Sequence, residues 1–372
     1  MPHYVVDARV VQDHFPGIGR YAWNLVQHLP AQLHADEFLT VLWDPDAQNT
    51  RLPIVDNAAN AHARVRFLPL RRSIFDPRNL LQPLPVRADV QHHTYYVRPL
   101  ARSRRTLTTL YDAIPFLHPE LFPSARTRLT IRLMHALAVL RSDALLTISH
   151  SAAADLAHFF PAARGKVIVT PLAADPVFQP QSEERIHAAR VRFDLPPHFA
   201  LYLGSNKPHK NLSRLIEAWE SIGQTGAALV VAGHIDLRYM HQVHASGVHF
   251  VGPISDGDAA ALYSACDAFV FPSLYEGFGL TPLEAMSCGA PVACSNTSSL
   301  PEVIGDAALL FDPHNPHEIA AAIRRLLNDA ADPALRAEMR TRSTARAAVF
   351  SWANTARATL DAYRNAISRR EN

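Results

Sequence analysis

The sequence predicts an α/β protein of two domains, each built on a doubly wound parallel sheet with helices on both faces. Two observations carry this prediction. Short β-branched or aromatic runs alternate with helical patterns through most of the chain, as in successive βαβ units. The chain of 372 residues is also longer than a domain with one hydrophobic core usually is, and it fits two domains of about 150 residues each.

The first half of the chain defines the N-terminal domain, which we expect over 1–180. Helical patterns cover 19–29, 124–141 and 151–159. The expected strands are the short apolar runs at 3–8, 37–43, 64–69, 88–93, 106–111, 143–148 and 166–170. The stretch 171–198 is rich in proline and charge, which predicts a linker with one helical piece and places the boundary there.

The second domain, expected over 181–350, repeats this order more clearly. Its strands are predicted at 199–203, 228–232, 248–252, 268–272, 291–294 and 307–311. The segment 351–372 predicts a final helix with an apolar face, and whether it packs back on the first domain is left open. Ligands bind open α/β sheets at the carboxyl ends of their strands, so we expect an interdomain binding cleft.

Composition and charge exclude several classes of protein. Hydrophobic residues make up 48% of the chain and the net charge is only +2, which predicts a folded protein that binds no nucleic acid. The three cysteines show no C-x-x-C spacing, which argues against disulfides and a zinc site. The first residues, M-P-H-Y-V-V-D, lack a secretion signal, and no run is long enough to span a membrane. We therefore expect a cytoplasmic protein.

One segment concentrates the predicted chemistry, the run E-G-F-G-L-T-P-L-E-A-M at 276–286. It follows a predicted strand, so it lies at a carboxyl end, where the binding cleft is expected. Gly277 and Gly279 allow the backbone to approach a ligand closely or to adopt a positive φ.

A helix is expected to begin within this segment. Thr281 can cap it and Pro282 suits its first turn, so its free N–H groups would form an anion site suited to a diphosphate. Glu284 falls three residues after Thr281. Taken alone, it is explained about equally well as the acid of a capping box or as a ligand-binding residue.

The spacing of the two acids resembles the E-x7-E signature of the retaining GT-B glycosyltransferases of family 4, the glycosyl transferases group 1. Both glycines and the proline match with them. The resemblance extends along most of the chain. Further similar segments are P-G-I-G-R-Y at 16–21, G-S-N-K-P-H-K-N-L at 204–212, V-G-P-I-S-D at 251–256, G-A-P-V at 289–292 and N-T-S-S-L-P-E-V at 296–303. It implies the GT-B fold, in which two Rossmann-like domains face each other across a cleft.

The resemblance also implies an activity. A hexose would pass from a nucleotide sugar to a saccharide or lipid-linked saccharide acceptor, with retention of configuration and without a metal or other cofactor. GDP-mannose or a related GDP-sugar is the best donor guess by analogy with the family, and UDP-sugars are the alternative. The product would belong to a surface polysaccharide or lipopolysaccharide. A nucleotide-sugar epimerase of the same fold and a non-catalytic nucleotide-sugar binding module are the competing hypotheses.

The residues that carry this activity follow from the matched positions. Lys210 would neutralise the departing diphosphate, Glu276 would face the hydroxyls of the donor sugar, and Glu284 would bind the ribose. Either Lys207 or His209 would supply a second cation. The other donor-binding residues implied are Gly17, Gly19, Ser205, Ile254, Gly277, Phe278, Gly279, Leu280 and Thr281.

Acceptor contacts are expected from the first domain. Asp112 is a catalytic candidate that would orient the acceptor, although a role as a turn residue at a strand end explains it equally well. Arg20, Tyr95 and Tyr111 are further acceptor candidates, and Tyr111 stands where the family commonly has a histidine. For the adjacent pair at 92–93 we favour a structural role over acceptor contact or metal binding.

Two motifs imitate the D-x-D of metal-dependent transferases, at 44–46 and at 256–258. Pro45 favours a turn, and Asp258 can cap a helix beginning at Ala259, so no metal site is expected.

Several arginines are crowded into the first half of the chain. They are Arg102, Arg104, Arg105, Arg126, Arg128 and Arg132. The basic amphipathic pattern over 124–134 leaves two alternatives open, a solvated helix face and peripheral contact with anionic lipid at the inner face of the cell membrane.

Overall fold

The computed structural model describes residues 1–14, 16–49, 52, 63–100, 104–122, 124–223, 226–239, 246–327 and 333–368. Arg102 lies outside these residues. The chain divides into two compact units, one formed by Met1–Leu172 with Ser351–Asn372 and the other by Ala173–Phe350. The division falls at Leu172 and not at 180 because Phe178 already packs on Tyr263 of the second unit.

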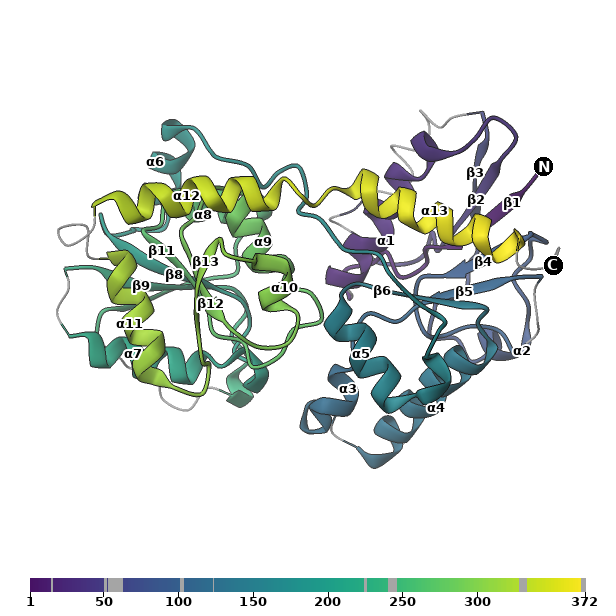
Figure 1. Ribbon diagram of the computed structural model, residues 1–372, viewed down its shortest axis with the longest axis horizontal. Coiled ribbons are helices and arrows are strands. Elements are labelled where there is room, and N and C mark those ends of the chain that lie inside the picture. The colour runs from purple at the N-terminus through teal and green to yellow at the C-terminus, as the bar shows by residue number, and fades with distance from the viewer. Residues whose placement is uncertain are drawn as a thin grey trace. The chain divides into compact units, whose positions relative to one another are not determined.

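The first unit is built on a seven-stranded parallel sheet with the order β3-β2-β1-β4-β5-β6-β7 (Figure 1). Each strand expected from the sequence is present. Their bounds are His3–Asp7 (β1), Phe38–Trp43 (β2), Val65–Pro69 (β3), Val90–His93 (β4), Thr106–Thr109 (β5), Ala144–Thr147 (β6) and Val167–Val169 (β7). The order reverses between β1 and β4, as in a doubly wound sheet.

Helices cover both faces of this sheet. In Figure 1, α1 and α13 lie on one face, and α4 and α5 lie on the other. The helices are α1 (Pro16–His28), α2 (Arg78–Leu81), α3 (Ile114–Leu117), α4 (Ala125–Arg141), α5 (His150–Phe159) and α13 (Trp352–Ser368). The starts of α4 and α5 are fixed by Ser124 and Ser149, whose hydroxyls accept hydrogen bonds from the backbone N–H groups of Thr127 and Ala152.

The C-terminal helix α13 belongs to the first unit and is fixed there by polar contacts, one of them fully buried. The Tyr363 hydroxyl lies 2.7 Å from Nδ1 of His92, and Arg364 Nη2 lies 2.8 Å from Glu37 Oε2. Although burial alone raises it, hydrogen bonds from Arg364 lower the pKa of Glu37 to about 2. The open question about 351–372 is thereby answered, since this helix completes the core of the N-terminal unit.

The second unit is built on a six-stranded parallel sheet with the order β10-β9-β8-β11-β12-β13. Its strands are Phe199–Leu203 (β8), Ala228–Ala232 (β9), Val248–Gly252 (β10), Ala268–Phe271 (β11), Val292–Ser295 (β12) and Ala308–Phe311 (β13). All six were expected. Nearly every side chain of β8 and β11 is buried, as in a sheet covered on both faces.

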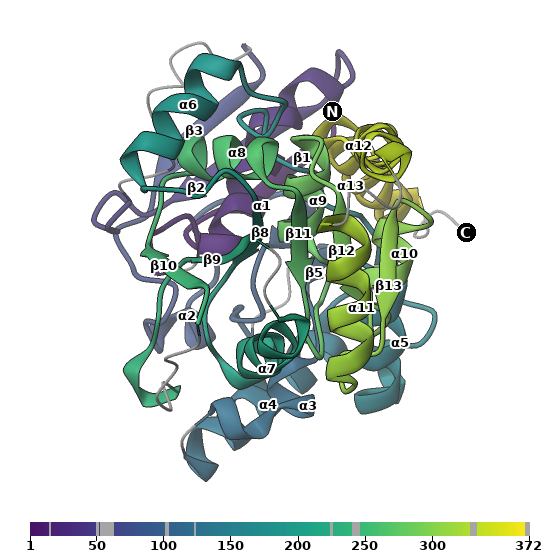
Figure 2. The ribbon, with the colours of Figure 1, turned by 90° about the vertical axis from the view of Figure 1, so that its left-hand side faces the viewer.

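Two layers of helices cover this second sheet. Figure 2 shows α7 and α11 side by side on one face and α8, α9 and α12 on the other. The helices of the second unit, including α6 and α10, are Glu183–Arg192 (α6), Leu212–Ile222 (α7), Asp256–Ala265 (α8), Leu280–Ser287 (α9), Leu300–Ile304 (α10), Pro316–Leu327 (α11) and Pro333–Ala347 (α12). Among the described residues, no helix is both long and apolar enough to cross a membrane.

The start of α8 corrects one sequence prediction. Asp258 was expected to cap a helix beginning at Ala259, but α8 begins at Asp256 and its cap is Ser255. The Ser255 hydroxyl accepts a hydrogen bond from the Asp258 backbone N–H, and the Asp258 carboxylate pairs with Arg192 at 3.0 Å. Serine is as good an N-cap as aspartate, and the helix begins directly after Ser255, so Asp258 lies inside the first turn.

The buried His92 makes the stability of the first unit depend on pH. Burial lowers the pKa of His92 to about 3, and the neighbouring His93 adds to the shift. Protons therefore bind the unfolded chain first, so stability falls as the pH drops from about 6.5 towards 3. We expect His92→Gln to make the midpoint of thermal unfolding less dependent on pH between 7.5 and 4, measured by calorimetry. Replacement of the exposed His158 by Gln is the control, and equal pH profiles for both variants would contradict the assignment.

Candidate functional site

The central feature of the second unit is an ion pair between Lys210 and Glu276. The Lys210 Nζ lies 2.7 Å from Glu276 Oε1, and the side chains are only 21% and 12% exposed. Lys210 belongs to the loop after β8, and Glu276 to the loop after β11. These strands pair in parallel, so their carboxyl ends bring both residues to one edge of the sheet.

Asn211 holds the loop of Lys210 in place. Its backbone adopts the left-handed conformation at φ 59°, and its buried side-chain amide donates hydrogen bonds to the carbonyl oxygens of Pro272 and Pro313, at 3.0 and 2.8 Å. The Leu274 N–H donates to the His209 carbonyl oxygen. The Asn211 side chain thus joins the loops that follow β8, β11 and β13, and no local sequence pattern predicts this role.

Two serines clamp the backbone of Glu276 from the loop after β12. Ser298 accepts a hydrogen bond from the Glu276 N–H at 3.0 Å, and Ser299 donates to the Glu276 carbonyl oxygen at 2.9 Å. Ser298 adopts a positive φ of 51°, which is uncommon for a residue with a side chain. These serines lie in the matched segment 296–303, but only the structure shows that they fix the carboxylate-bearing residue.

The helix α9 starts at Leu280 with Gly279 as its N-cap, which corrects the expected cap at Thr281. Gly279 has φ 103°, and a Cβ at this position would lie 2.8 Å from Leu300 Cδ2, so only glycine fits without strain. Position N3 of the helix is therefore Pro282. Glu284 lies further into the helix, so it is not the acid of a capping box.

The other residues predicted to bind the donor in the second unit differ in how exposed their side chains are. Lys207 is exposed whereas His209 is buried. Glu284 is buried on α9. Ser205, Ile254, Leu280 and Thr281 are half-buried, and Gly277 and Phe278 are buried.

Glycines allow the backbones that follow β8 and β9 to approach each other closely. Gly204 N–H donates to the Ala232 carbonyl oxygen at the end of β9, and Gly233 adopts φ 118°. A Cβ on Gly233 would collide with the carbonyl oxygen of Gly204. The Tyr202 hydroxyl donates to the Ser205 carbonyl oxygen at 2.6 Å, and burial, together with the charge of Glu276, raises the pKa of Tyr202.

In the first unit, the predicted glycine loop is the first turn of a helix. Gly17 and Gly19 lie in α1, which begins at Pro16 and not at 19, because proline suits a first turn. A Cβ at Gly19 would lie 3.3 Å from the carbonyl oxygen of Val10, so this glycine permits close contact with the segment after β1. Arg20 follows in the same turn and is half-buried.

The acceptor candidates of the first unit have structural contacts. Asp112 accepts a hydrogen bond from the Ile114 N–H at 2.9 Å, the geometry of a turn residue before α3. The Tyr111 hydroxyl donates to the Thr94 carbonyl oxygen at 2.6 Å. Tyr95 is buried against Tyr96, with ring centroids 4.0 Å apart.

Both histidines at the end of β4 are buried and have structural contacts, as the sequence analysis favoured. His92 lies between Tyr363 and Thr109, and His93 Nδ1 lies 3.8 Å from Asp7 Oδ2. Within the described part of the chain, no group of three or more histidine, cysteine or acidic side chains could hold a metal ion.

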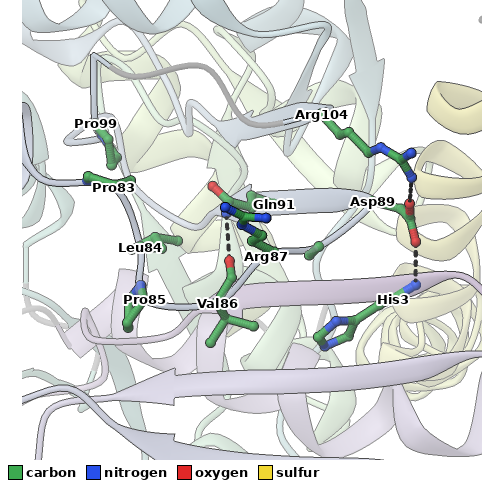
Figure 3. Close-up of a pocket in the computed structure, with 11 residues that line it drawn as sticks. His3, Pro83, Leu84, Pro85, Val86, Arg87, Asp89, Gln91, Pro99 and Arg104 are labelled. Atoms are coloured by element: carbon green, nitrogen blue, oxygen red, sulfur yellow. Dashed lines mark hydrogen bonds and ion pairs between the residues drawn. The ribbon is translucent and has the colours of Figure 1, made fainter.

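A pocket of about 700 Å³ lies at the edge of the first sheet where the strands begin, opposite the edge formed by their carboxyl ends (Figure 3). His3 begins β1 and Asp89 precedes β4, so this pocket is at the amino ends of the strands. The dashed lines in Figure 3 join Asp89 to His3 and to Arg104. Since ligands of open α/β sheets bind at the carboxyl ends, we do not assign the catalytic site to it.

Comparison with known proteins identifies the family. The sequence model of the Glycosyl transferases group 1 matches residues 183–346, which include the ion pair and α9. The O-antigen chain mannosyltransferase B of Escherichia coli is 30% identical over 371 residues, covering 94% of this chain and 96% of that protein. This chain belongs to the group 1 glycosyltransferases.

Solved structures agree on the fold of this group 1 glycosyltransferase. Sucrose-phosphate synthase from Thermosynechococcus elongatus matches with a TM-score of 0.72 at 20% identity, covering 99% of this chain and 100% of that chain. HepE of Anabaena, solved in complex with UDP and glucose, matches with a TM-score of 0.70 at 18% identity, covering 97% and 98%. The expected GT-B class, with two Rossmann-like domains, is confirmed.

The backbone at Gly279 gives a test of how the site of this glycosyltransferase is built. We expect Gly279→Ala to lower the free energy of unfolding by about 1–3 kcal/mol, because alanine must adopt a positive φ and displace Leu300. Urea denaturation measures the change. Gly257→Ala is the matched control, at a helical glycine where an added Cβ would meet only the Ser255 Oγ, at an ordinary contact distance of 3.9 Å, and it should change stability by no more than about 1 kcal/mol. A loss of equal size in both variants would show that the conformation of Gly279 is not what matters.

Proposed function

We propose that this chain is a retaining hexosyltransferase that transfers mannose from GDP-mannose, or a related GDP-sugar, to a saccharide of a surface polysaccharide or lipopolysaccharide. The observation that carries the proposal is the Lys210–Glu276 ion pair at the carboxyl edge of the second sheet. The relative named as an O-antigen chain mannosyltransferase supports mannose and this class of acceptor. UDP-sugars are the alternative donors, since HepE was solved with UDP and glucose.

The ion pair fits the chemistry of a nucleotide sugar. In such a donor the β-phosphate and the hexose are joined through one oxygen, so a cation and a carboxylate 2.7 Å apart can reach both sides of the bond that breaks. As the bond breaks, negative charge develops on the diphosphate, and Lys210 stabilises it. Glu276 accepts hydrogen bonds from the hydroxyls of the sugar.

The acceptor hydroxyl attacks the anomeric carbon on the face from which the diphosphate departs. Its proton passes to the diphosphate, which Lys210 holds. This front-face route retains the configuration of the sugar without a covalent intermediate, so Glu276 has no role as a nucleophile.

Three further features of the second unit suit the nucleotide. Lys207 is exposed beside Lys210 in sequence and adds a second positive charge. The free N–H groups at the start of α9 favour a diphosphate. Glu284 is proposed to hold the ribose hydroxyls, together with Ser205 and Ile254. Since these cations neutralise the leaving group, we propose that catalysis needs no metal ion or other cofactor.

The remaining predicted residues take part in the same proposal. The segment proposed to bind the donor consists of Gly277, Phe278, Gly279, Leu280 and Thr281. Gly17 and Gly19 are proposed to contact the donor from the first unit. For the acceptor we propose Asp112 as the orienting carboxylate, with Arg20, Tyr95 and Tyr111 as further contacts.

A thermal-shift panel of GDP-, UDP-, ADP- and dTDP-sugars tests the donor. We expect GDP-mannose to raise the midpoint of unfolding most. Lys210→Ala should weaken donor binding by about 10–100-fold, since it removes a charge-assisted hydrogen bond, and Glu284→Ala should also weaken it. Glu276→Ala should instead lower turnover by about 100-fold with little change in donor affinity.

The controls for this experiment separate the alternatives. Glu217→Ala, at an exposed acid of α7, should behave as wild type. EDTA should leave the rate unchanged, and the product should keep the anomeric configuration of the donor. An isomerised donor formed without acceptor would favour an epimerase, and the absence of a shift with every nucleotide sugar would overturn the proposal.

We further propose that the protein is cytoplasmic and that helix α4 contacts anionic lipid at the inner face of the cell membrane. Leu129, Leu133 and Leu140 are 58%, 54% and 63% exposed, and spacings of four and seven residues place them on one stripe of the helix. Arg126 and Arg132 stand on either side of this stripe. Exposed leucines flanked by arginines can bind the surface of an anionic membrane.

Vesicle sedimentation tests the membrane proposal. With vesicles of phosphatidylcholine and phosphatidylglycerol at low salt, we expect the wild type to sediment. The double variant Leu129→Ser, Leu133→Ser should lower the partition coefficient by about tenfold or more. Val191→Ser, at an exposed valine of α6, is the control and should sediment like the wild type. If the wild type stays in the supernatant, helix α4 is only a solvated face.

A further inference from the structure

The pocket of about 700 Å³ at the amino ends of the first sheet has no part in the proposed reaction (Figure 3). None of its lining residues is a proposed contact of the donor or of the acceptor. Its volume lies within the range of about 300–1,000 Å³ that is usual for sites that bind small molecules. The pocket is therefore large enough for a small organic ligand.

One wall of the pocket is apolar and rigid. It is formed by Pro83, Leu84 and Pro85, with Pro99 beside them in Figure 3. The Leu84 side chain anchors this wall because it is buried in an apolar cluster of the first unit. The Leu100 N–H donates to a carbonyl oxygen of α2 at 2.8 Å, which fixes the neighbouring Pro99. Since proline rings fix φ, little conformational entropy is lost when a ligand packs on this wall.

The opposite wall is polar and contains a compensated pair of charges. The Asp89 carboxylate accepts hydrogen bonds from the His3 N–H at 3.0 Å and from Arg104 Nη1 at 2.5 Å (Figure 3). Although burial alone raises it, these hydrogen bonds lower the pKa of Asp89, so the carboxylate is ionised at neutral pH. Arg104 and Asp89 together therefore add no net charge to the pocket.

Two polar side chains between these walls have unused hydrogen-bonding capacity. Arg87 is exposed and forms no ion pair with any residue that the structure describes. Gln91 is only 8% exposed, and its Nε2 donates to the Val86 carbonyl oxygen at 3.0 Å, as Figure 3 shows. Its Oε1 accepts no hydrogen bond from the described part of the chain. A largely buried amide oxygen without a donor costs free energy until a ligand or water bonds to it.

These groups together favour an anion that has an apolar body. Because Arg104 is paired with Asp89, Arg87 supplies the uncompensated positive charge of the described lining, so an anion is favoured over a cation. An inorganic ion would leave the proline wall uncovered. A purely apolar molecule would desolvate Arg87 and Gln91 without bonding to either of them.

We propose that this pocket binds a small organic anion that carries an N–H or O–H donor. Its acid group would pair with Arg87, its donor would bond to Gln91 Oε1, and its apolar body would pack on Pro83 and Pro85. This site goes beyond the proposed transfer reaction and does not depend on it. Since His3 begins β1 and Gln91 belongs to β4, the ligand stabilises the folded form of the first unit.

Isothermal titration calorimetry of the full chain with indole-3-acetate tests this site, since the probe joins a carboxylate, an N–H donor and an aromatic ring. We expect one binding site per chain. Indole-3-acetamide, which lacks the charge, and 1-methylindole-3-acetate, which lacks the N–H, should each bind about tenfold more weakly. Equal affinities for the three probes, or no binding of indole-3-acetate, would overturn the proposal.

Variants assign the binding to this pocket. Arg87→Gln should weaken indole-3-acetate binding by about tenfold and remove the preference over indole-3-acetamide, because an exposed side chain loses its charge. Gln91→Glu should also weaken it, since two carboxylates then repel each other. Arg66→Gln, at an exposed arginine of β3 that does not line the pocket, is the matched control and should bind like the wild type.

The donor separates this site from the proposed reaction. Saturating GDP-mannose should leave the affinity for indole-3-acetate unchanged, because no lining residue is a proposed donor contact. Competitive displacement of the probe by GDP-mannose, or undiminished binding by Arg87→Gln, would show that the probe binds elsewhere and overturn the assignment.

Discussion

The arrangement of the second unit depends on holding one cation and one carboxylate together at a sheet edge. Lys210 and Glu276 come from loops separated by 66 positions in the chain, and only the pairing of β8 with β11 brings them to 2.7 Å. Asn211 fixes the loop that carries the cation, and Ser298 with Ser299 fixes the backbone of the carboxylate. Most of the positioning therefore comes from short polar side chains and not from the charged pair itself.

The fold could be predicted from the sequence because parallel strands buried on both faces leave a strong signal. All thirteen strands of the described residues lie where apolar runs predicted them. Starts of helices were harder, because Thr281 and Asp258 have the right chemistry for caps but Gly279 and Ser255 take these positions. Local propensity could not choose between candidates two or three residues apart, whereas the backbone of the preceding loop does.

The residues of the candidate site could be predicted from the sequence, but the side chains that hold them in place could not. The spacing of Glu276 and Glu284 and the lysines of the donor loop pointed to a nucleotide sugar. Nothing local indicated that Asn211 would reach Pro272 and Pro313, since the latter contact spans 102 positions.

The C-terminal helix α13 has a consequence for how the chain matures. His92 and Tyr363 are 271 positions apart, yet they share a buried hydrogen bond in the first unit. During synthesis the N-terminal sheet leaves the ribosome long before the helix that covers one of its faces. That face of the sheet stays partly exposed to solvent until the second unit and α13 have been synthesised. The second unit, by contrast, can fold as soon as its own residues emerge. The part of the protein that is translated first is thus the part that is finished last.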